Sequence, residues 1–332
     1  AVSPGDKRIT GGNEDVDMKM PLPIPHRNRQ PLNRGQVWIR ALRLHFVLPS
    51  VLPGVLGAAV AWSQGYAVRF PDFILTLAGV AVNHLGLNMI DDVFDYRHNI
   101  DLKKSHEKNP FTGGSGVLTD GLLTAREMQA AAALCFAATI LSGLFLTYRR
   151  GWTVLFLGLF GMASSVFYTM PPIKFGYRGF GELGLLINFG PVIVMGAYFV
   201  QAGRLAWEPL LISLVLGLMM WSMIVINEIP DYDADREGGK NNLVVLLGRD
   251  VAVALYTGGL LLAYLIPPLG IGLGIFTPLT LLIWLSLPWA WRSLNILIRH
   301  RHDPLRLAPA NLAMIKVHTL TGLALIAAYL LP

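Results

Sequence analysis

Long apolar runs separated by short polar segments occupy most of the chain from residue 44 onward. A helix needs roughly 20 apolar residues to cross about 30 Å of hydrocarbon, and nine runs approach that length. The pattern therefore predicts an all-α, polytopic membrane bundle of about nine helices around a central cavity. The nine runs centre on residues 44–63, 73–91, 129–147, 152–170, 181–201, 209–229, 251–269, 272–291 and 312–331.

Two boundaries leave the number of crossings at eight or nine. Only Tyr148–Gly151 separates the third run from the fourth, and the eighth run contains Pro278 and Pro288. Composition supports the membrane assignment, since 53% of the residues are hydrophobic and 14% are charged. Soluble domains carry about 25% charged residues.

Basic residues fall mainly on one side of the predicted membrane. Lys and Arg that flank membrane helices are retained on the cytoplasmic side. With nine spans, 22 of the 27 basic residues lie before the first span or in loops on that same side, against four in the opposite loops. The N-terminus is therefore predicted to be cytoplasmic. The net charge of +6 reflects this topology and contact with anionic lipid, and it requires no nucleic-acid partner.

The segment before the first run divides into two parts. Residues 1–35 are polar and rich in Pro, Gly and Asn, without the apolar region of a signal peptide, and they are predicted to form a mobile cytoplasmic tail. Residues 36–332 form the predicted membrane domain. At its start, residues 33–46 are either a short amphipathic helix on the membrane surface or an extension of the first span. Cys135 is the only cysteine, so no disulfide is expected.

Two acidic clusters, Asp91–Asp95 and Asp231–Asp235, each follow an even-numbered apolar run. Both are therefore predicted at the cytoplasmic face, each after the second member of a four-helix set, which implies two pseudo-repeated halves. Asn88 and Asn227 stand four residues before Asp92 and Asp231, a spacing that places each pair on one helix face. Carboxylates massed at the end of a membrane helix need a compensating cation. The clusters therefore predict a site for a magnesium diphosphate.

Four motifs resemble the UbiA superfamily of intramembrane prenyltransferases, and the second acidic motif is similar to the branch that prenylates 1,4-dihydroxy-2-naphthoate in menaquinone synthesis. The resemblance covers roughly residues 36–332. Asp91, where the family usually has Asn, and Asn99, where the naphthoate branch commonly has Gly, depart from it. The matching segments are Asp91–Tyr96 with Asp101, Asn227–Arg236 continuing into Gly239–Gly248, Pro110–Gly116, and Tyr168–Lys174 with Tyr177–Glu182.

The resemblance implies transfer of a prenyl group from a polyprenyl diphosphate to an aromatic acceptor. In the naphthoate branch the carboxylate of the acceptor leaves as CO₂, and the product is demethylmenaquinone. Membership of this branch would place the protein in a prokaryotic plasma membrane. The allylic C–O bond breaks to leave a carbocation and a diphosphate, whose growing negative charge must be neutralised. Mg²⁺, expected as two ions, would supply that neutralisation.

The candidate site residues follow from this chemistry. As catalytic metal ligands we predict Asp92, Asp95, Asp231 and Asp235. Lys174 is predicted as a further catalytic residue, whose positive charge would bind the phosphates. Arg178 and Lys240 are predicted as substrate-binding residues that contact the phosphates in the same way. The remaining substrate-binding candidates are Asn88, Asn227, Asp101 and Tyr168, whose ring face suits a carbocation.

Several alternatives stay open at this stage. A cation-binding transporter would also use paired acidic helix ends, although its charged residues would lie nearer the bilayer midplane. Acceptors of other UbiA branches, or a cyclase or other lyase of the same fold, would use the same diphosphate machinery. Glu182 is either functional or a helix N-terminal charge. His84 faces either the cavity or a packed neighbour, and a satisfied core histidine is the preferred interpretation. Gly113–Gly116 is either a lid over the cavity or a simple flexible loop.

Overall fold

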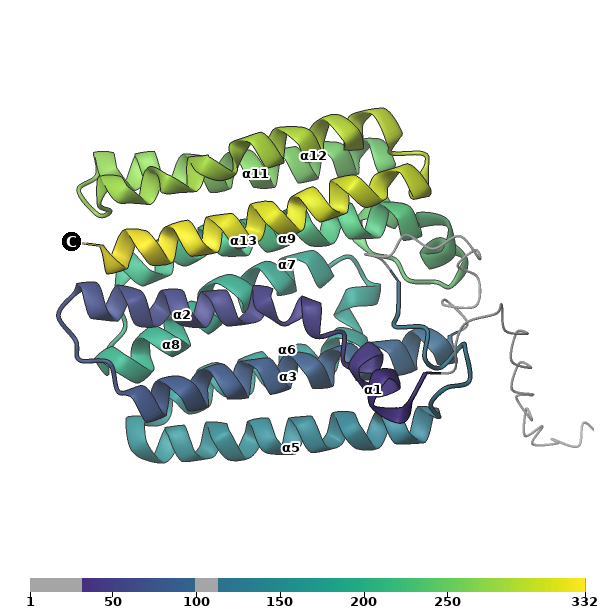
Figure 1. Ribbon diagram of the computed structural model, residues 1–332, viewed down its shortest axis with the longest axis horizontal. Coiled ribbons are helices and arrows are strands. Elements are labelled where there is room, and N and C mark those ends of the chain that lie inside the picture. Colours follow the sequence, from purple (N-terminus) through teal and green to yellow (C-terminus); the bar gives the residue numbers. More distant parts are fainter. Residues whose placement is uncertain (1–31, 99–112, 332) are drawn as a thin grey trace, which may run out of the picture.

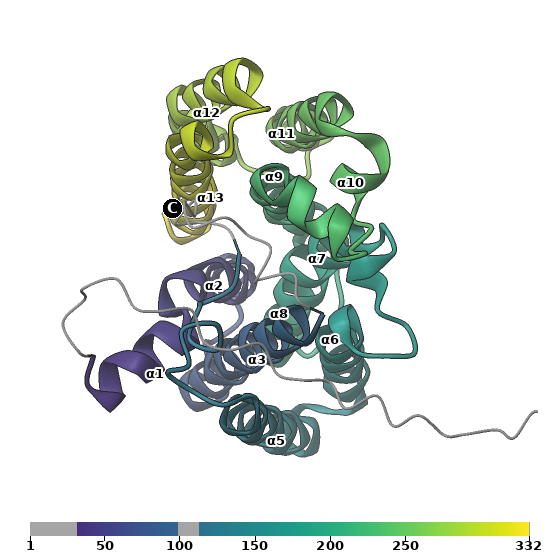
Figure 2. The ribbon, with the colours of Figure 1, turned by 90° about the vertical axis from the view of Figure 1, so that its right-hand side faces the viewer.

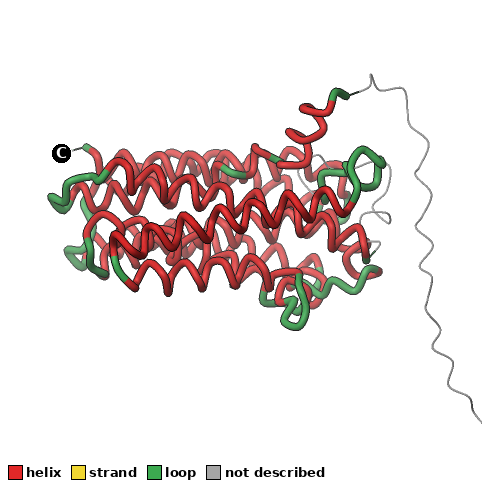
Figure 3. Tube along the Cα trace, turned by 90° about the horizontal axis from the view of Figure 1, so that it is seen from below, coloured by secondary structure: helices red, strands yellow, loops and turns green. Residues whose placement is uncertain are grey.

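The computed structural model describes residues 32–98 and 113–331. Within these ranges all regular secondary structure is helical, and the helices run side by side with their loops gathered at two ends (Figures 1 and 3). The all-α prediction is therefore confirmed. Residues 1–31 of the predicted tail lie outside the described residues, and so does Asp101.

Nine helical segments of the described residues run the length of the bundle. Eight of them are long and apolar enough to span a membrane, and the first, α2, has 16 residues and is shorter. The start of the described chain, at α1, and the C-terminus lie at opposite ends of the bundle (Figure 1). The crossings are α2 (Leu48–Ser63), α3 (Phe70–Arg97), α5 (Ala125–Arg150), α6 (Trp152–Thr169), α7 (Gly181–Ile187) with η3 and α8 (Ile193–Ala202), α9 (Trp207–Glu237), α11 (Arg249–Gly272), η4 (Pro278–Ser286) with α12 (Leu287–His300), and α13 (Ala308–Leu330).

The two uncertain boundaries have local explanations. A single residue, Gly151, separates α5 from α6, and its φ of 104° is accessible to glycine and strained for other residues. In the eighth crossing, Pro278 begins a 3₁₀ segment and Pro288 lies in the first turn of α12, where its missing N–H costs no helical hydrogen bond. Both interruptions therefore leave the crossings intact.

The segment before α2 is a separate amphipathic helix, α1 (Arg34–Leu42). Asn33 and Gln36 form a capping box at its start, and Arg43 in the left-handed conformation ends it. Figure 3 shows α1 set at an angle to the bundle, at the end where α3 finishes. Of the two alternatives for residues 33–46, a helix separate from the first span is therefore the one observed, and its position at the membrane surface stays a prediction.

Viewed end-on, the helices surround the middle of the bundle in a closed arrangement (Figure 2). The acidic clusters lie at the C-terminal ends of α3 and α9, the second helices of the two four-helix sets. The main apolar core is built from α2, α8, α9, α11 and α13. The α3 helix packs in a second core with α1 and α5, and α2 and α8 contact both α3 and α9, so they hold the two acidic helix ends relative to one another.

The fifth crossing is bent where it packs on α9. Its middle is a π-helical turn, η3 (Asn188–Val192), which contains Pro191 and separates α7 from α8. At this bend Gly190 lies against the α9 backbone, where a Cβ would come 2.7 Å from the Ser213 carbonyl oxygen and 2.9 Å from Gly217 Cα. The close approach of the two backbones therefore requires glycine.

Replacing Gly190 with Ala is expected to destabilise the protein by about 1–3 kcal/mol, because the added methyl group overpacks a backbone contact. Gly258→Ala is the matched control, since a Cβ at that helical position meets no atom within 4 Å and Ala favours helix. Thermal unfolding in detergent measures both. A Gly190→Ala midpoint equal to that of wild type would contradict the close packing of η3 on α9.

Candidate active site

The ends of α3 and α9 meet at one cavity of about 170 Å³. Amide, carboxylate and lysine side chains from both acidic regions face it, together with apolar residues from neighbouring helices. Its polar lining comprises Arg43, His84, Asn88, Asp91, Asp95, Tyr168, Asn227, Glu228, Asp231, Asp235 and Lys240. The structure therefore brings together the two clusters that the sequence analysis paired.

On α3 the cavity-facing residues are Asn88, Asp91 and Asp95, which follow one another at helical spacing. Asp92 is buried but lies on the adjacent face. Its carboxylate lies 3.6 Å from the Arg43 guanidinium and accepts a 2.9 Å hydrogen bond from the Ser115 backbone N–H. The position occupied by Asp91, which departs from the family pattern, is thus the one that lines the cavity.

Tyr177 and Lys240 are donors to Asp95 among the described residues. The Tyr177 hydroxyl donates to it over 2.6 Å, and Lys240 Nζ lies 3.3 Å away in an ion pair that is almost fully buried. Burial lowers the pKa of Lys240, but the carboxylates of Asp95, Asp91 and Asp235 outweigh it and raise that pKa well above its ordinary value. Burial and Asp95 also raise the pKa of Tyr177, so both groups remain donors at neutral pH.

On α9 the polar residues that line the cavity are Asn227, Glu228, Asp231 and Asp235. Asn311 of α13 donates to the Asn227 side-chain oxygen over 2.8 Å. This bond leaves the Asn227 amide nitrogen as a donor for a ligand. Asp235 accepts a 2.9 Å hydrogen bond from Asn242, whose own side-chain oxygen caps α10 (Leu243–Leu247).

The glycine-rich segment connects the two acidic regions. Gly113 N–H donates to Asp231 over 3.0 Å, and Ser115 N–H donates to Asp92. Arg40 of α1 donates to the Ser115 carbonyl oxygen over 2.8 Å and so ties α1 to this segment. Gly113 and Gly114 line the cavity. The segment is therefore a wall of the site that binds carboxylates through its backbone.

Two predicted cations lie outside the lining of this cavity. Lys174 Nζ is 3.2 Å from His98 Nε2, and the exposed Arg178 donates to the Pro172 carbonyl oxygen. Tyr168 and Lys240, in contrast, line the cavity. The roles assigned to Lys174 and Arg178 stay predictions.

Four contributors to the site were not selected from the sequence: Arg43, Tyr177, Glu228 and Asn311. Glu228 is adjacent to Asn227 and carries a sequence signal, because a charged residue inside an apolar run is expected to be functional. Glu228 and Glu182 are both buried. Glu182 also accepts a 2.6 Å bond from the Leu243 N–H at the start of α10, so it anchors a neighbouring helix as well as its own.

The cavity supplies oxygen ligands from both acidic helix ends, the type that Mg²⁺ prefers. Asp91 Oδ1 is buried and receives no hydrogen bond from the described residues. Those residues hold no group of three His, Cys, Asp or Glu side chains that forms a ready-made metal centre. This fits an ion that takes its remaining ligands from water and from a phosphorylated substrate, the usual arrangement for Mg²⁺.

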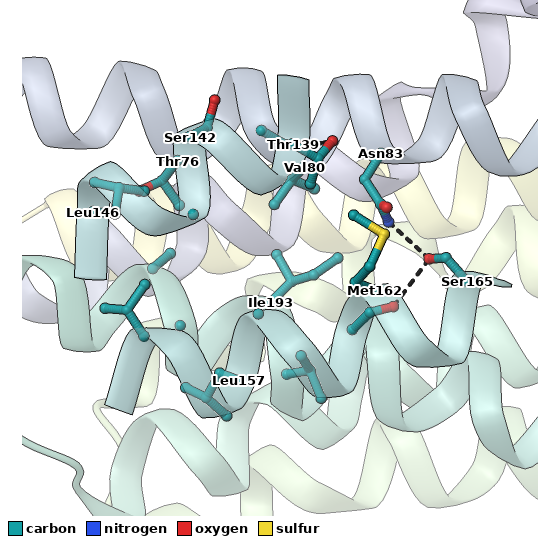
Figure 4. A pocket seen from close by; sticks show the side chains of 18 of the residues that line it. Thr76, Val80, Asn83, Thr139, Ser142, Leu146, Leu157, Met162, Ser165 and Ile193 are labelled. Carbon is teal, nitrogen blue, oxygen red and sulfur yellow. Dashed lines mark hydrogen bonds between the residues drawn. The ribbon is translucent and has the colours of Figure 1, made fainter. Parts of the chain in front are cut away.

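A second, larger cavity of about 320 Å³ lies deeper in the bundle, between α3, α5, α6 and α8. Figure 4 shows Val80, Leu146, Leu157, Met162 and Ile193 pointing into it, so its walls are mainly apolar. A hydrogen bond of 2.7 Å joins Asn83 to Ser165 across it. His84, Leu87 and Phe189 line both cavities, which therefore share one wall.

A polar, carboxylate-lined cavity at the end of a membrane bundle, adjoining an apolar one within it, suits an amphiphile whose anionic head binds together with a divalent cation. The fold and the two cavities are those of an integral membrane protein that binds such a molecule inside its helix bundle. The chain belongs to the UbiA prenyltransferase family, whose family model matches residues 50–315. The resemblance inferred from the motifs is thereby confirmed.

Named relatives and a solved structure agree with this assignment. The chain is 27% identical to 2-carboxy-1,4-naphthoquinone phytyltransferase of Synechocystis over 89% of this chain and 93% of that protein. It is 26% identical to 1,4-dihydroxy-2-naphthoate octaprenyltransferase of Bacillus subtilis over 78% of this chain and 81% of that protein. The structure of a UbiA homolog from Archaeoglobus fulgidus bound to GPP and Mg²⁺ shares the fold, with a TM-score of 0.54 at 13% identity over 88% of this chain and 99% of that one.

Proposed function

We propose that the protein transfers a prenyl group from a polyprenyl diphosphate to 1,4-dihydroxy-2-naphthoate, with loss of CO₂, to give demethylmenaquinol, the hydroquinone form of demethylmenaquinone. The observation that carries the proposal is the cavity at the joined ends of α3 and α9, with carboxylates from both helices on its walls. Two relatives whose names specify naphthoate or naphthoquinone prenylation support the choice of acceptor.

The diphosphate would lie in the polar cavity. Asp91, Asp95, Asp231 and Asp235 are the candidate ligands for Mg²⁺, which would neutralise the leaving diphosphate when bound. Lys240 adds a fixed positive charge, and the amide nitrogens of Asn88 and Asn227 are donors for phosphate oxygens. Asp92 would act indirectly, by holding Arg43 and the Gly113–Gly116 segment in place.

The prenyl tail would lie in the apolar cavity. That cavity meets the polar one at His84, Leu87 and Phe189, so a molecule with a charged head and an apolar tail can occupy both. Each buried CH₂ group contributes about 0.8 kcal/mol of binding. The bond that breaks, between the first tail carbon and the diphosphate, then lies near the shared wall, where water is excluded from the carbocation.

The acidic clusters lie at the same end of the bundle as α1 and as the majority of the loops that carry Lys and Arg. This end would face the cytoplasm, where soluble phosphorylated substrates are available. We therefore propose a prokaryotic plasma membrane as the location, with the mouth of the site on the cytoplasmic side. The lipid bilayer is the medium from which the tail enters.

Turnover by the purified protein tests the acceptor. Geranylgeranyl diphosphate is offered with 1,4-dihydroxy-2-naphthoate, 4-hydroxybenzoate or homogentisate, each with Mg²⁺ and with EDTA, and products are identified by mass. We expect a metal-dependent adduct with the naphthoate that lacks the carboxylate. An adduct with another acceptor would move the protein to a different branch, and release of diphosphate with no adduct would indicate a lyase.

A further inference from the structure

His84 is the ionisable side chain among the described residues that line the apolar cavity. It lies on α3, one turn before Asn88, and also lines the polar cavity. Its ring is 9% exposed, although the sequence pattern was interpreted as that of a packed core histidine. That interpretation is only half correct, since the ring is buried but reaches both cavities.

The imidazole is held in a defined orientation. Nδ1 is 2.5 Å from the Ser50 hydroxyl on α2, and the ring meets Phe189 edge to face with centroids 5.6 Å apart. When Nδ1 carries the hydrogen and donates to Ser50, Nε2 is left as an acceptor. Two neighbouring elements therefore orient the ring and direct its second nitrogen.

Nε2 has no hydrogen-bond partner among the described residues. Buried polar groups in folded proteins are almost always hydrogen-bonded, so an exception at a cavity wall points to a ligand. The nearby wall residues Leu87 and Phe189 offer no polar group. A ligand donor at the junction of the cavities would satisfy Nε2.

The role inferred for His84 rests on the proposed function, which brings the reacting atoms to the wall shared by the two cavities. With the diphosphate among the carboxylates and the tail in the apolar cavity, the allylic carbon lies at the shared wall. The acceptor ring must approach the same carbon to react, which places its hydroxyl within the range of His84. The four aspartates of the polar cavity are assigned to the metal, and its remaining carboxylate, Glu228, does not line the apolar cavity, whereas His84 lines both cavities.

We propose that His84 is a catalytic residue whose Nε2 accepts the hydroxyl proton of the aromatic acceptor. The O–H bond breaks and its electron pair stays on the oxygen, which becomes a carbonyl as the adjacent ring carbon, the one that bears the carboxylate, bonds to the allylic carbon. The electrons of the broken allylic C–O bond leave with the diphosphate, and the intermediate is a β-keto carboxylate. When CO₂ leaves, the electron pair of the broken C–C bond restores the aromatic ring and the oxygen takes the proton back from Nε2, so the product is the hydroquinone and no net proton is consumed.

Two substitutions test the proposal. His84→Asn keeps a group near Ser50 but removes the Nε2 position, and Ser50→Ala removes the hydroxyl that orients the ring. General-base catalysis contributes about 10²–10⁴-fold, so we expect kcat of His84→Asn to fall by at least about 10²-fold. A smaller loss is expected for Ser50→Ala. The control is His318→Asn, which replaces another buried histidine that lines neither cavity.

Two further measurements separate proton transfer from a structural role. Affinity for geranylgeranyl thiolodiphosphate, an inert analogue, should stay within about threefold of wild type in His84→Asn, because the diphosphate site is unchanged. Activity should recover with naphthoates whose hydroxyl is more acidic, since these need less help from a base.

The proposal is overturned if His84→Asn keeps kcat near wild type, if its loss of activity parallels a loss of analogue binding, or if acceptor acidity makes no difference. Failure of the proposed function has a different signature, in which wild type itself forms no adduct with any acceptor. That result would overturn the role of His84 as well, whereas an active His84→Asn variant leaves the prenyl transfer intact.

Discussion

Asp231→Asn is expected to lower kcat for prenyl transfer by about 10²–10³-fold or more, with little change in the folded structure. The substitution keeps the shape of the side chain and removes the charge that would hold Mg²⁺ against the diphosphate. Loss of one group that stabilises developing charge in a transition state commonly has an effect of that size. Initial rates at saturating substrate measure it.

Asp233→Asn is the matched control, because it makes the same chemical change two residues away on α9. The Asp233 side chain is 73% exposed and pairs with Arg249, whose side chain is 14% exposed, and neither residue lines the cavity. The carboxylate that is removed is exposed to solvent and lies outside the site, so activity should stay within about twofold. Equal losses in the two variants would show that the acidic cluster acts through its overall charge.

Gly196→Phe is expected to raise KM for geranylgeranyl diphosphate on the order of 10²-fold. Gly196 lines the apolar cavity on α8, about 10 Å beyond Phe189 along the helix, and a Cβ there meets no atom within 4 Å. The aromatic ring would occupy space proposed for the far part of the tail. Each CH₂ group that loses its burial costs about 0.8 kcal/mol.

Dimethylallyl diphosphate provides the internal control for this variant, since its single isoprene unit ends before Gly196. Its KM should change by less than about threefold. Gly258→Phe adds the same ring to α11, at an open position outside both cavities, and should leave both substrates unaffected. A Gly196→Phe variant that handles long and short substrates like wild type would place the tail elsewhere.

The helices were predictable because a segment that spans lipid must be apolar over about 20 consecutive residues, which can be read directly from the sequence. Each apolar run corresponds to one crossing of the bundle. The acidic clusters were equally visible, since charges at membrane helix ends are rare. The sequence did not decide whether Asp91 or Asp92 enters the cavity. The two residues follow Asn88 by three and four positions, and both spacings are compatible with one helix face. Only the packing of α3 decides which carboxylate enters the cavity.

Loop side chains were the least predictable part of the site. Lys174 adopts a left-handed backbone conformation and turns toward His98, a contact that depends on the tertiary fold. Arg43 and Asn311 entered the site from helices distant in sequence. The apolar cavity likewise arises from the packing of four helices, and no single apolar run distinguishes a cavity wall from a lipid-facing surface.

The central claim is that α3 and α9 jointly hold one magnesium diphosphate. Calorimetric binding of geranylgeranyl thiolodiphosphate to wild type, Asp95→Asn and Asp231→Asn, with Mg²⁺ and with EDTA, tests it most directly. The account predicts tight binding by wild type with Mg²⁺, and severe loss with EDTA or with either substitution alone. Binding that persists without Mg²⁺, or that survives the loss of one helix's carboxylate, would contradict a shared site.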